Sequence, residues 1–267
     1  MRLDEFATIH LPALERDEAR HNLMVAAIHG AANNPSLELR FWSLGSPGAC
    51  AVQLPGRPIV IGDLDQAQCR TLAQDTCTLD YPAVWGPDQT ATWFTARATE
   101  LGSRFDEPMA QRIHALRDKP VYPGAAGEPR LAGTDDLDLI VDWVALFIRE
   151  AIPHETAAAR EHIEKSVAEG RYLLWTAQAA PVSMAAIARR SGTGAAISMV
   201  YTPPRFRGRG YAGSVTAALV ERVVAQGKTM ACLFTDQRNP YSNRCYAKIG
   251  FRPVCDALLY PRIVPRR

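Results

Sequence analysis

Three arginines and two glycines fall within one short stretch in the second half of the chain, Arg205-Phe206-Arg207-Gly208-Arg209-Gly210. A short apolar run, Ala195 to Val200, leads into it, and apolar residues at helical spacing follow from Tyr211 to Gln226. The glycines therefore stand where a strand becomes a helix. A helix start offers unsatisfied backbone N–H groups and the positive end of the helix dipole, so this turn suits an anion, and a phosphate best of all. The arginines add positive charge at the same place.

A second group of residues with chemical potential lies further along the chain. Asn239, Asn243 and Tyr246 are spaced i, i+4 and i+7, so they share one face of a helix that Asn239-Pro240 begins and Gly250 ends. A phenol with a pKa of about 10 is neutral at pH 7 and can act as a general acid. Tyr246 is the phenol on this helix face. Two plainer readings stay open, in which Asn239 only caps the helix and Tyr246 is a core aromatic.

The overall composition describes an ordinary globular protein. The 267 residues are 47% hydrophobic and 22% charged with a net charge of +2, so no basic field favours nucleic acid. No apolar run approaches about 18 residues, so we expect no membrane span, and we expect a cytoplasmic location. The six cysteines form no C-x-x-C pair and no H-E-x-x-H occurs, so we expect no metal.

Residue patterns predict which elements position these groups. In the first segment we expect a helix over 12–33, strands over 37–44, 49–54, 58–61 and near Trp85, a helix from Asp63 through 74, a helix over 88–101 and a strand over 110–116. In the second segment we expect helices over 134–152 and 154–169, strands over 172–177, 182–188 and 195–202, the helix over 211–226, a strand over 229–235, the helix over 239–249 and a strand over 252–260.

The stretch from Lys119 to Gly133 is rich in proline and glycine and indicates a domain boundary, because the order of elements restarts after it. We therefore predict two modules, 1–122 and 126–267. A long surface loop within one domain is the alternative. Both segments place strands, then a helix, then a strand, which suggests a duplication without a residue-level repeat.

The two motifs together resemble those of the GCN5-related N-acetyltransferase (GNAT) superfamily. Arg205 to Gly210 fits the signature Q/R-x-x-G-x-G/A, and Asn239 to Phe251 fits the later pattern N-x-x-S-x-x-x-Y-x-x-x-G-F. The resemblance covers about 126–262 and is closest to the FR47-like predicted acetyltransferases. It implies an α/β (α+β) fold with a central mixed, mostly antiparallel sheet flanked by helices. The first module would be a degenerate GNAT-like partner in a tandem arrangement.

The resemblance also implies a co-substrate, acetyl-CoA, and roles for named residues. Backbone N–H groups from Arg207 to Ala212 would bind the pyrophosphate, and the strand over 200–202 would pair with the pantetheine amides. A backbone N–H near Val200 would polarise the thioester carbonyl, and Tyr246 would protonate the leaving thiolate. The predicted coenzyme-binding residues are Val200, Tyr201, Thr202, Arg205, Arg207, Gly208, Arg209, Gly210, Tyr211, Ala212, Asn239 and Asn243.

The expected partners are acetyl-CoA and a primary amine on a small molecule, an amino acid or a peptide. No residue is identified as the base that deprotonates this amine; Ser198, Glu150, His154, Glu155 and a water relay stay open. Two other functions stay open as well. One is an acyl-CoA sensor without catalysis, and the other is nucleic-acid binding through R-F-R-G-R-G, which the nearly neutral charge disfavours. The oligomeric state is also open, with a homodimer as one option.

Overall fold

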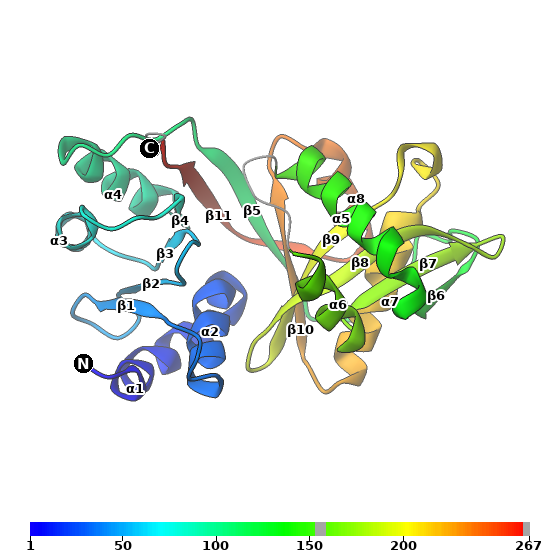
Figure 1. The fold of residues 1–267 in the computed structure, drawn as a ribbon, viewed down its shortest axis with the longest axis horizontal. Coiled ribbons are helices and arrows are strands. Elements are labelled where there is room, and N and C mark those ends of the chain that lie inside the picture. Colours follow the sequence, from blue (N-terminus) through cyan, green and yellow to red (C-terminus); the bar gives the residue numbers. More distant parts are fainter. Residues whose placement is uncertain (153–158, 264–267) are drawn as a thin grey trace. The chain divides into compact units, whose positions relative to one another are not determined.

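The computed structural model describes residues 1–152 and 159–263, and Figure 1 shows its elements along the chain. The helices are α1 (Leu3–Leu14), α2 (Glu18–Asn33), α3 (Gln66–Thr76), α4 (Asp88–Glu100), α5 (Leu137–Ala151), α6 (Arg160–Ala168), α7 (Tyr211–Ala225) and α8 (Pro240–Ile249). The strands are β1 (Arg40–Ser43), β2 (Cys50–Gln53), β3 (Ile59–Ile61), β4 (Ala83–Pro87), β5 (Met109–Leu116), β6 (Glu128–Leu131), β7 (Tyr172–Ala177), β8 (Ala180–Arg190), β9 (Gly194–Tyr201), β10 (Met230–Asp236) and β11 (Arg252–Pro261). This order confirms the predicted α/β class.

The chain forms two compact units, and each is built from segments that are separate in the sequence. Unit 1 comprises Met1–Ile113, Phe234–Arg238 and the residues from Pro253 on, and unit 2 comprises His114–Leu233 and Asn239–Arg252. The predicted division at 122 and 126 followed the proline- and glycine-rich segment. In the structure the last strand, β11, contributes nearly all of its residues to unit 1. The module boundaries themselves stay a prediction.

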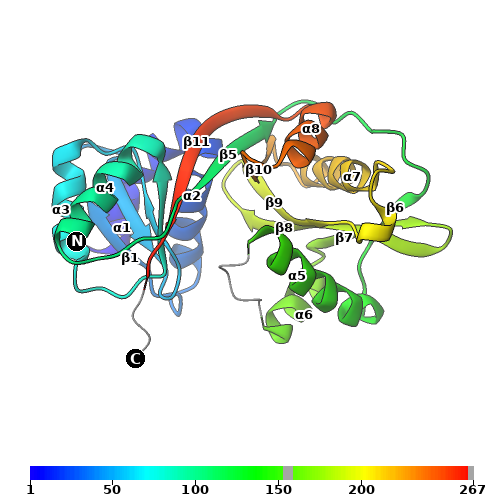
Figure 2. The same ribbon diagram turned by 90° about the horizontal axis from the view of Figure 1, so that it is seen from above.

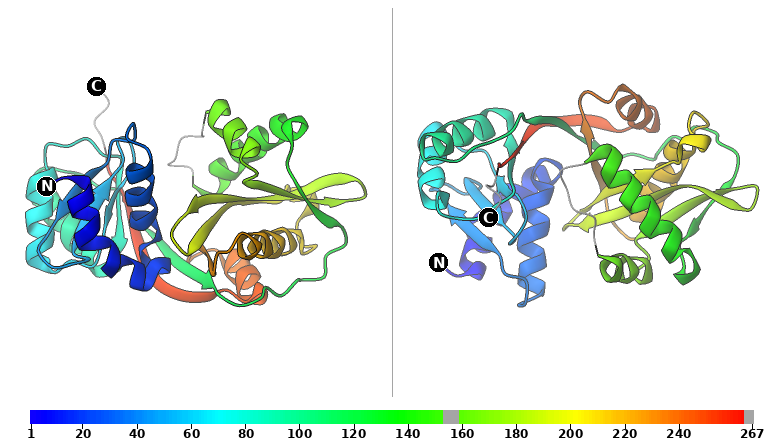
Figure 3. Two further views of the ribbon diagram at one scale, coloured as in Figure 1. Left: turned by 90° about the horizontal axis from the view of Figure 1, so that it is seen from below. Right: turned by 45° about the horizontal axis from the view of Figure 1, so that its top comes forward.

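Unit 1 is a mixed sheet with helices on both faces. Strands β1, β2 and β3 pair antiparallel in that order, β3 pairs parallel with β4, and β4 pairs antiparallel with β11. Helices α3 and α4 pack against Ala51 and Ile61 on one face, and α1 and α2 pack against Cys50 and Val52 on the other (Figure 3). The alternation of buried side chains along each strand produces these two layers.

Unit 2 repeats the same plan. Strands β6, β7, β8 and β9 pair antiparallel in that order, and β9 pairs parallel with β10. Helices α5 and α6 lie on one face and α7 and α8 on the other (Figure 2). Helix α5 presents an apolar stripe to one hydrophobic cluster: Ile140, Val144 and Ile148 are buried in it, and Leu137, Val141 and Phe147 pack against it. The mixed, mostly antiparallel sheet flanked by helices is the predicted fold.

Several local predictions need correction. Asp65, not Asp63, caps α3, and Asp63 instead accepts hydrogen bonds from Arg20. The proline- and glycine-rich segment contains a strand, β6, which the sequence pattern did not indicate. The helix predicted from His154 begins at Arg160 within the described residues, and 153–158 lie outside them.

Residues 121–127, here called the strap, are held along unit 2 by specific contacts. The Val121 N–H donates to the Ile249 carbonyl at 2.8 Å, and the Tyr122 hydroxyl donates to Glu221 at 2.7 Å. The strap also crosses the first turn of α7, because a Cβ placed on Gly213 would lie only 2.6 Å from Cγ of Pro123. Gly213 is therefore required by packing.

Gly213→Ala should destabilise the protein although alanine favours a helix. The added methyl meets Pro123, and overpacking of this kind costs about 1–3 kcal/mol against a helix-propensity gain of about 1 kcal/mol. We expect a net loss of about 1 kcal/mol in the free energy of unfolding, measured by urea denaturation. In a Pro123→Ala background the clash disappears, and Gly213→Ala should then stabilise. Destabilisation in both backgrounds would contradict the contact.

The described residues, 1–152 and 159–263, contain neither a membrane-spanning helix nor a group of metal ligands. None of their helices combines the length and the apolar character needed to cross a membrane. No three His, Cys, Asp or Glu side chains among them are grouped so that they can hold a metal ion.

Candidate functional site

Strand β9 ends in a bulge next to the predicted anion site. Met199 has a φ of +52°, a left-handed conformation that is strained for a residue with a side chain. The register with β8 shifts there, since Met184 faces Tyr201 but Ala186 faces Ser198. The alternation of side chains reverses as a result: Met199 packs with the α5 and α6 cluster and Val200 with the α7 cluster. A bulge of this kind redirects backbone N–H groups out of the ladder.

The bulged end of β9 pairs on one side only within the described ranges. Its parallel pairing with β10 covers Gly194 to Ala196 and ends there. The strand continues to Tyr201, where the partner on the other side is Met184 of β8. Backbone groups after Ala196 are therefore placed to accept an extended ligand as a neighbouring strand.

The predicted phosphate turn has the backbone that its glycines permit. A short 3₁₀ turn over Pro204–Phe206 leads to Gly208 with a φ of +77° and Gly210 with a φ of +82°. Gly210 is the N-cap of α7 and provides no side-chain cap for the first N–H groups of the helix. Gly208 has no heavy atom within 4 Å of where a Cβ would lie, so its need for glycine is conformational. The turn is exposed and offers backbone donors to an anion.

The three loop arginines are placed differently from one another. Arg205 lies over the ring of its neighbour Phe206 at 4.7 Å. Arg207 donates from Nε to the Thr202 carbonyl at 2.9 Å and from Nη2 to Glu150 at 2.5 Å. Arg209 is exposed and has no ion pair with any other described residue. The sequence could not separate these roles, because all three side chains belong to the same charged motif.

Helix α8 carries the second motif. Asn239 is its N-cap, as predicted, and its Oδ1 accepts from the N–H groups of Tyr241 and Ser242 at 3.1 Å each. Asn243 is half-buried. Tyr241, in the first turn of the same helix, lies in solvent: its side chain is 78% exposed and lies under the guanidinium of Arg244.

Tyr246 is buried in the α7 cluster, where it meets Phe251 edge to face with ring centroids 5.9 Å apart. The same cluster contains Tyr211, and Val200 and Phe206 pack against it, so it joins α8 to the loop and to the bulged strand end. Burial raises the pKa of the Tyr246 phenol above its ordinary value. The phenol is therefore neutral at physiological pH, which a proton donor requires.

Among the bases left open by the sequence, Ser198 is half-buried in β9 opposite Ala186, and Glu150 has side-chain contacts near the strand end. Glu150 lies in the last turn of α5 and accepts from Arg207 and, at 3.4 Å, from the Tyr201 hydroxyl. Burial and the Glu150 charge raise the pKa of Tyr201. His154 and Glu155 lie outside the described residues.

The corresponding turn of unit 1 is built to exclude an anion. Between β3 and α3 the chain reads Gly62-Asp63-Leu64-Asp65. The Asp65 carboxylate accepts the N–H of Gln68 at 2.8 Å, and the Gln68 side chain accepts the N–H of Asp65 at 2.9 Å. This capping box fills the helix N-terminus with the protein's own carboxylate. A phosphate would be repelled there.

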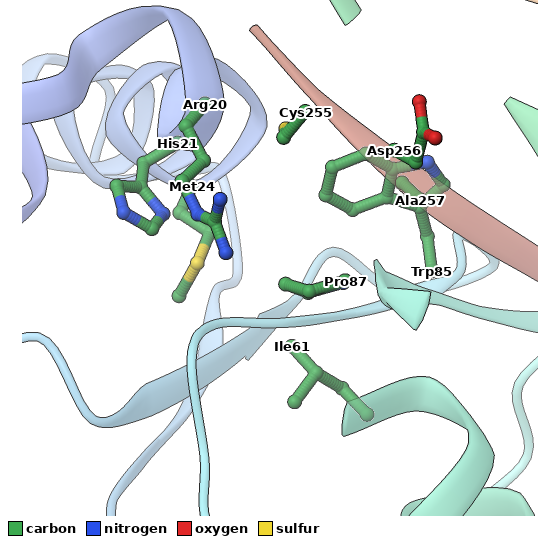
Figure 4. Close-up of a pocket in the computed structure, with 9 residues that line it drawn as sticks. All are labelled: Arg20, His21, Met24, Ile61, Trp85, Pro87, Cys255, Asp256 and Ala257. Atoms are coloured by element: carbon green, nitrogen blue, oxygen red, sulfur yellow. The ribbon is translucent and has the colours of Figure 1, made fainter. Parts of the chain in front are cut away.

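The cavity in unit 1 and the groove in unit 2 described here are not lined by residues of the glycine turn over 208–210. In unit 1 a cavity of about 10 Å³, room for about one water, is lined by residues of α2, β3, β4 and β11, with His21, Trp85 and Cys255 among them (Figure 4). Burial lowers the pKa of His21 at its wall and raises that of Cys255 to about 11, so neither is charged at neutral pH. In unit 2 an open groove of about 430 Å³ runs beside Tyr122 and Arg222. A turn that binds through exposed backbone N–H groups needs no enclosed volume.

Comparisons with known proteins bear on this arrangement. A model of the FR47-like protein family matches residues 176–258, which include both motifs. Curated protein sequences gave no match. A Drosophila protein of known structure superposes with a TM-score of 0.72 at 12% identity, over 100% of this chain and 98% of that one. A GCN5-related N-acetyltransferase from Kribbella flavida gives 0.59 at 16% identity, over 91% and 96%. A tandem GNAT protein from the clavulanic acid biosynthesis pathway gives 0.53 at 13%, over 91% and 89%.

These likenesses confirm the resemblance read from the two motifs. At identities of 12% to 16% the superpositions concern the fold, and the fold of this chain is that of GNAT proteins. The likeness to a tandem GNAT protein extends over both units. The FR47-like pattern itself lies in the second half of the chain.

Proposed function

We propose that the chain transfers an acetyl group from acetyl-CoA to a primary amine of a small molecule, an amino acid or a peptide. The observation that carries the proposal is the exposed glycine turn over 208–210, which opens α7 and is joined to the bulged end of β9 by a short 3₁₀ turn. The GNAT fold of the superposed proteins supports it. Backbone donors at a helix start suit the pyrophosphate of coenzyme A.

In the proposed reaction the neutral amine nitrogen attacks the thioester carbonyl carbon, and the C–S bond breaks. The nitrogen loses one proton, the thiolate takes one from Tyr246, and the proton released by the nitrogen restores the phenol through solvent. The N–H groups of 207–212 bind the pyrophosphate, and the backbone of 200–202 pairs with the pantetheine arm. A redirected N–H near Val200 stabilises the developing oxyanion. Tyr246 protonates the thiolate.

The two asparagines have narrower proposed roles than the sequence allowed. Oδ1 of Asn239 already accepts two helix N–H groups, so only its amide N–H donors remain for the pantetheine carbonyls. Asn243, one turn further along the same helix, is proposed to contact the arm or to orient Tyr246.

Thiol release across a panel of amines tests the proposal. We expect acetyl-CoA to bind and free thiol to appear with at least one primary amine, with the N-acetylated product confirmed by mass spectrometry. Coenzyme A binding by calorimetry without release for any amine would instead favour the second candidate, a non-catalytic acyl-CoA sensor. The engagement of Glu150 by Arg207 favours that candidate, because it occupies a carboxylate near the strand end. An absence of coenzyme A binding would contradict both.

A further inference from the structure

Arg207 belongs to the predicted phosphate-binding motif by sequence, yet its side chain contacts the strand end and α5. Its Nε donates to the Thr202 carbonyl, its Nη2 donates to Glu150, and its Cζ lies 5.8 Å from the centre of the Tyr201 ring. Two of the strongest donors of the guanidinium are therefore used within the protein. A phosphate ligand would need those donors directed toward the glycine turn.

The strand end that Arg207 contacts contains a residue with a strained backbone. Met199 occupies the left-handed region, and such a residue persists only where the surroundings over-determine it. On the β8 side, the Ser183 hydroxyl donates to the Tyr201 carbonyl at 3.1 Å and lies 2.9 Å from Oγ1 of Thr202. From the loop, Arg207 donates to the next carbonyl, that of Thr202. Side chains of β8 and of the loop therefore both hydrogen-bond to this segment.

Stability alone does not account for the Glu150–Arg207 pair. The two side chains are 38% and 49% exposed, and ion pairs with that exposure contribute little to folding because water screens them. Tyr201, by contrast, is buried, and its hydroxyl accompanies Arg207 on the same carboxylate. The contacts converge on one place, the end of β9 after the bulge.

We propose that Arg207 is a positioning residue, which together with Glu150 clamps residues 199–202 in the conformation that receives the thioester, and that Arg209 provides the phosphate-directed charge of the loop. The inference rests on the proposed function for its catalytic consequence. The clamp itself is a property of the free protein. It assigns to Glu150 a role that the sequence had left open, as the anchor of the clamp on α5.

A donor that lacks phosphates separates positioning from phosphate binding. With acetyl-CoA and with S-acetylpantetheine, Arg207→Gln should lower kcat/KM by the same factor, about tenfold, because the strand end is misplaced for both donors. Arg209→Gln should lower kcat/KM for acetyl-CoA only. Glu150→Gln should reproduce Arg207→Gln, and the double variant should lose no more than either single variant. The melting temperature should stay near that of the wild type in all of them.

Hydrogen exchange of the unliganded protein provides a readout that needs no activity. Amides in the peptide over 197–203 should exchange faster in Arg207→Gln and Glu150→Gln and at the wild-type rate in Arg209→Gln. The proposal is overturned if that exchange is unchanged in Arg207→Gln, or if Arg207→Gln impairs acetyl-CoA but spares S-acetylpantetheine. If the wild type neither binds coenzyme A nor transfers acetyl, the proposed function fails, and the exchange result still decides for or against the clamp.

Discussion

Replacing Gly208 and Gly210 together by alanine is expected to weaken coenzyme A binding by about 30- to 1000-fold. Both residues have a positive φ, and holding a residue with a side chain there costs about 1–2 kcal/mol each. In the alanine variant the unliganded loop can relax out of that conformation. Coenzyme A binding must then restore it, so the backbone cost reduces the binding free energy. A total of about 2–4 kcal/mol gives the stated factor, since about 1.4 kcal/mol corresponds to tenfold. Isothermal titration calorimetry with coenzyme A measures it.

A matched control separates loop geometry from general backbone strain. Gly102 and Gly227 also have positive φ values, of +96° and +81°, and a Cβ at either would meet no heavy atom within 4 Å. The variant with alanine at both control positions should be destabilised by about 1–2 kcal/mol per position, the same backbone cost as in the loop. Its affinity for coenzyme A should stay at the wild-type value. Equal affinities in the loop variant and the control variant would show that the turn does not hold the pyrophosphate, and the proposed function would lose its main support.

The sequence predicted those features that depend on residues close to one another in the chain. Asn239-Pro240 begins α8 and Gly250 ends it, because a cap, a fixed proline φ and a left-handed glycine are local properties. The helix predicted over 134–152 and the strands predicted over 182–188 and 195–202 correspond to α5, β8 and β9, because apolar spacing is a local property in the same way. Both motifs of the candidate site could be located for this reason.

Features set by contacts distant in sequence were not predictable. No sequence pattern indicates that β11 pairs with β4 in unit 1, because the residues of a strand do not specify which other strand it pairs with. Nothing in the type of Met199 signals a positive φ, because methionine rarely adopts one and the surrounding contacts impose it. Likewise, the need for glycine at position 213 follows from its packing against Pro123, which is distant in sequence. The direction of the Arg207 side chain follows from its ion pair with Glu150.

Tyr246→Phe is expected to lower turnover by about 100-fold or more while coenzyme A affinity stays near the wild-type value, because general-acid catalysis contributes about 10²- to 10⁴-fold. The ring contact with Phe251 stays in place, so the free energy of unfolding should change little. Tyr241→Phe is the matched control on the same helix, since that side chain is 78% exposed. Unchanged turnover in Tyr246→Phe would remove Tyr246 from the mechanism.

The raised pKa of Tyr246 fixes the sign of the pH dependence. A phenol whose pKa lies above its ordinary value of about 10 stays protonated below that value and loses its proton only as the pH rises through the higher one. The wild type should therefore show no loss of kcat between pH 7 and about 10 that Tyr246→Phe lacks. A decline centred near pH 8 or 9 in the wild type alone would contradict a buried, neutral donor.

The leaving thiol distinguishes a proton donor from a core aromatic. Burial makes the Tyr246 phenol less acidic, but a thiolate in the same apolar surroundings is destabilised as well. The phenol can therefore protonate the thiolate because it is placed close to it. Thioesters of more acidic thiols need less protonation, so the defect of Tyr246→Phe should shrink steadily as the thiol pKa falls, in a series of acetyl donors measured by single-turnover kinetics. If the hydroxyl only helped α8 to pack, the defect would be the same for every donor, and Tyr246 would not be the acid.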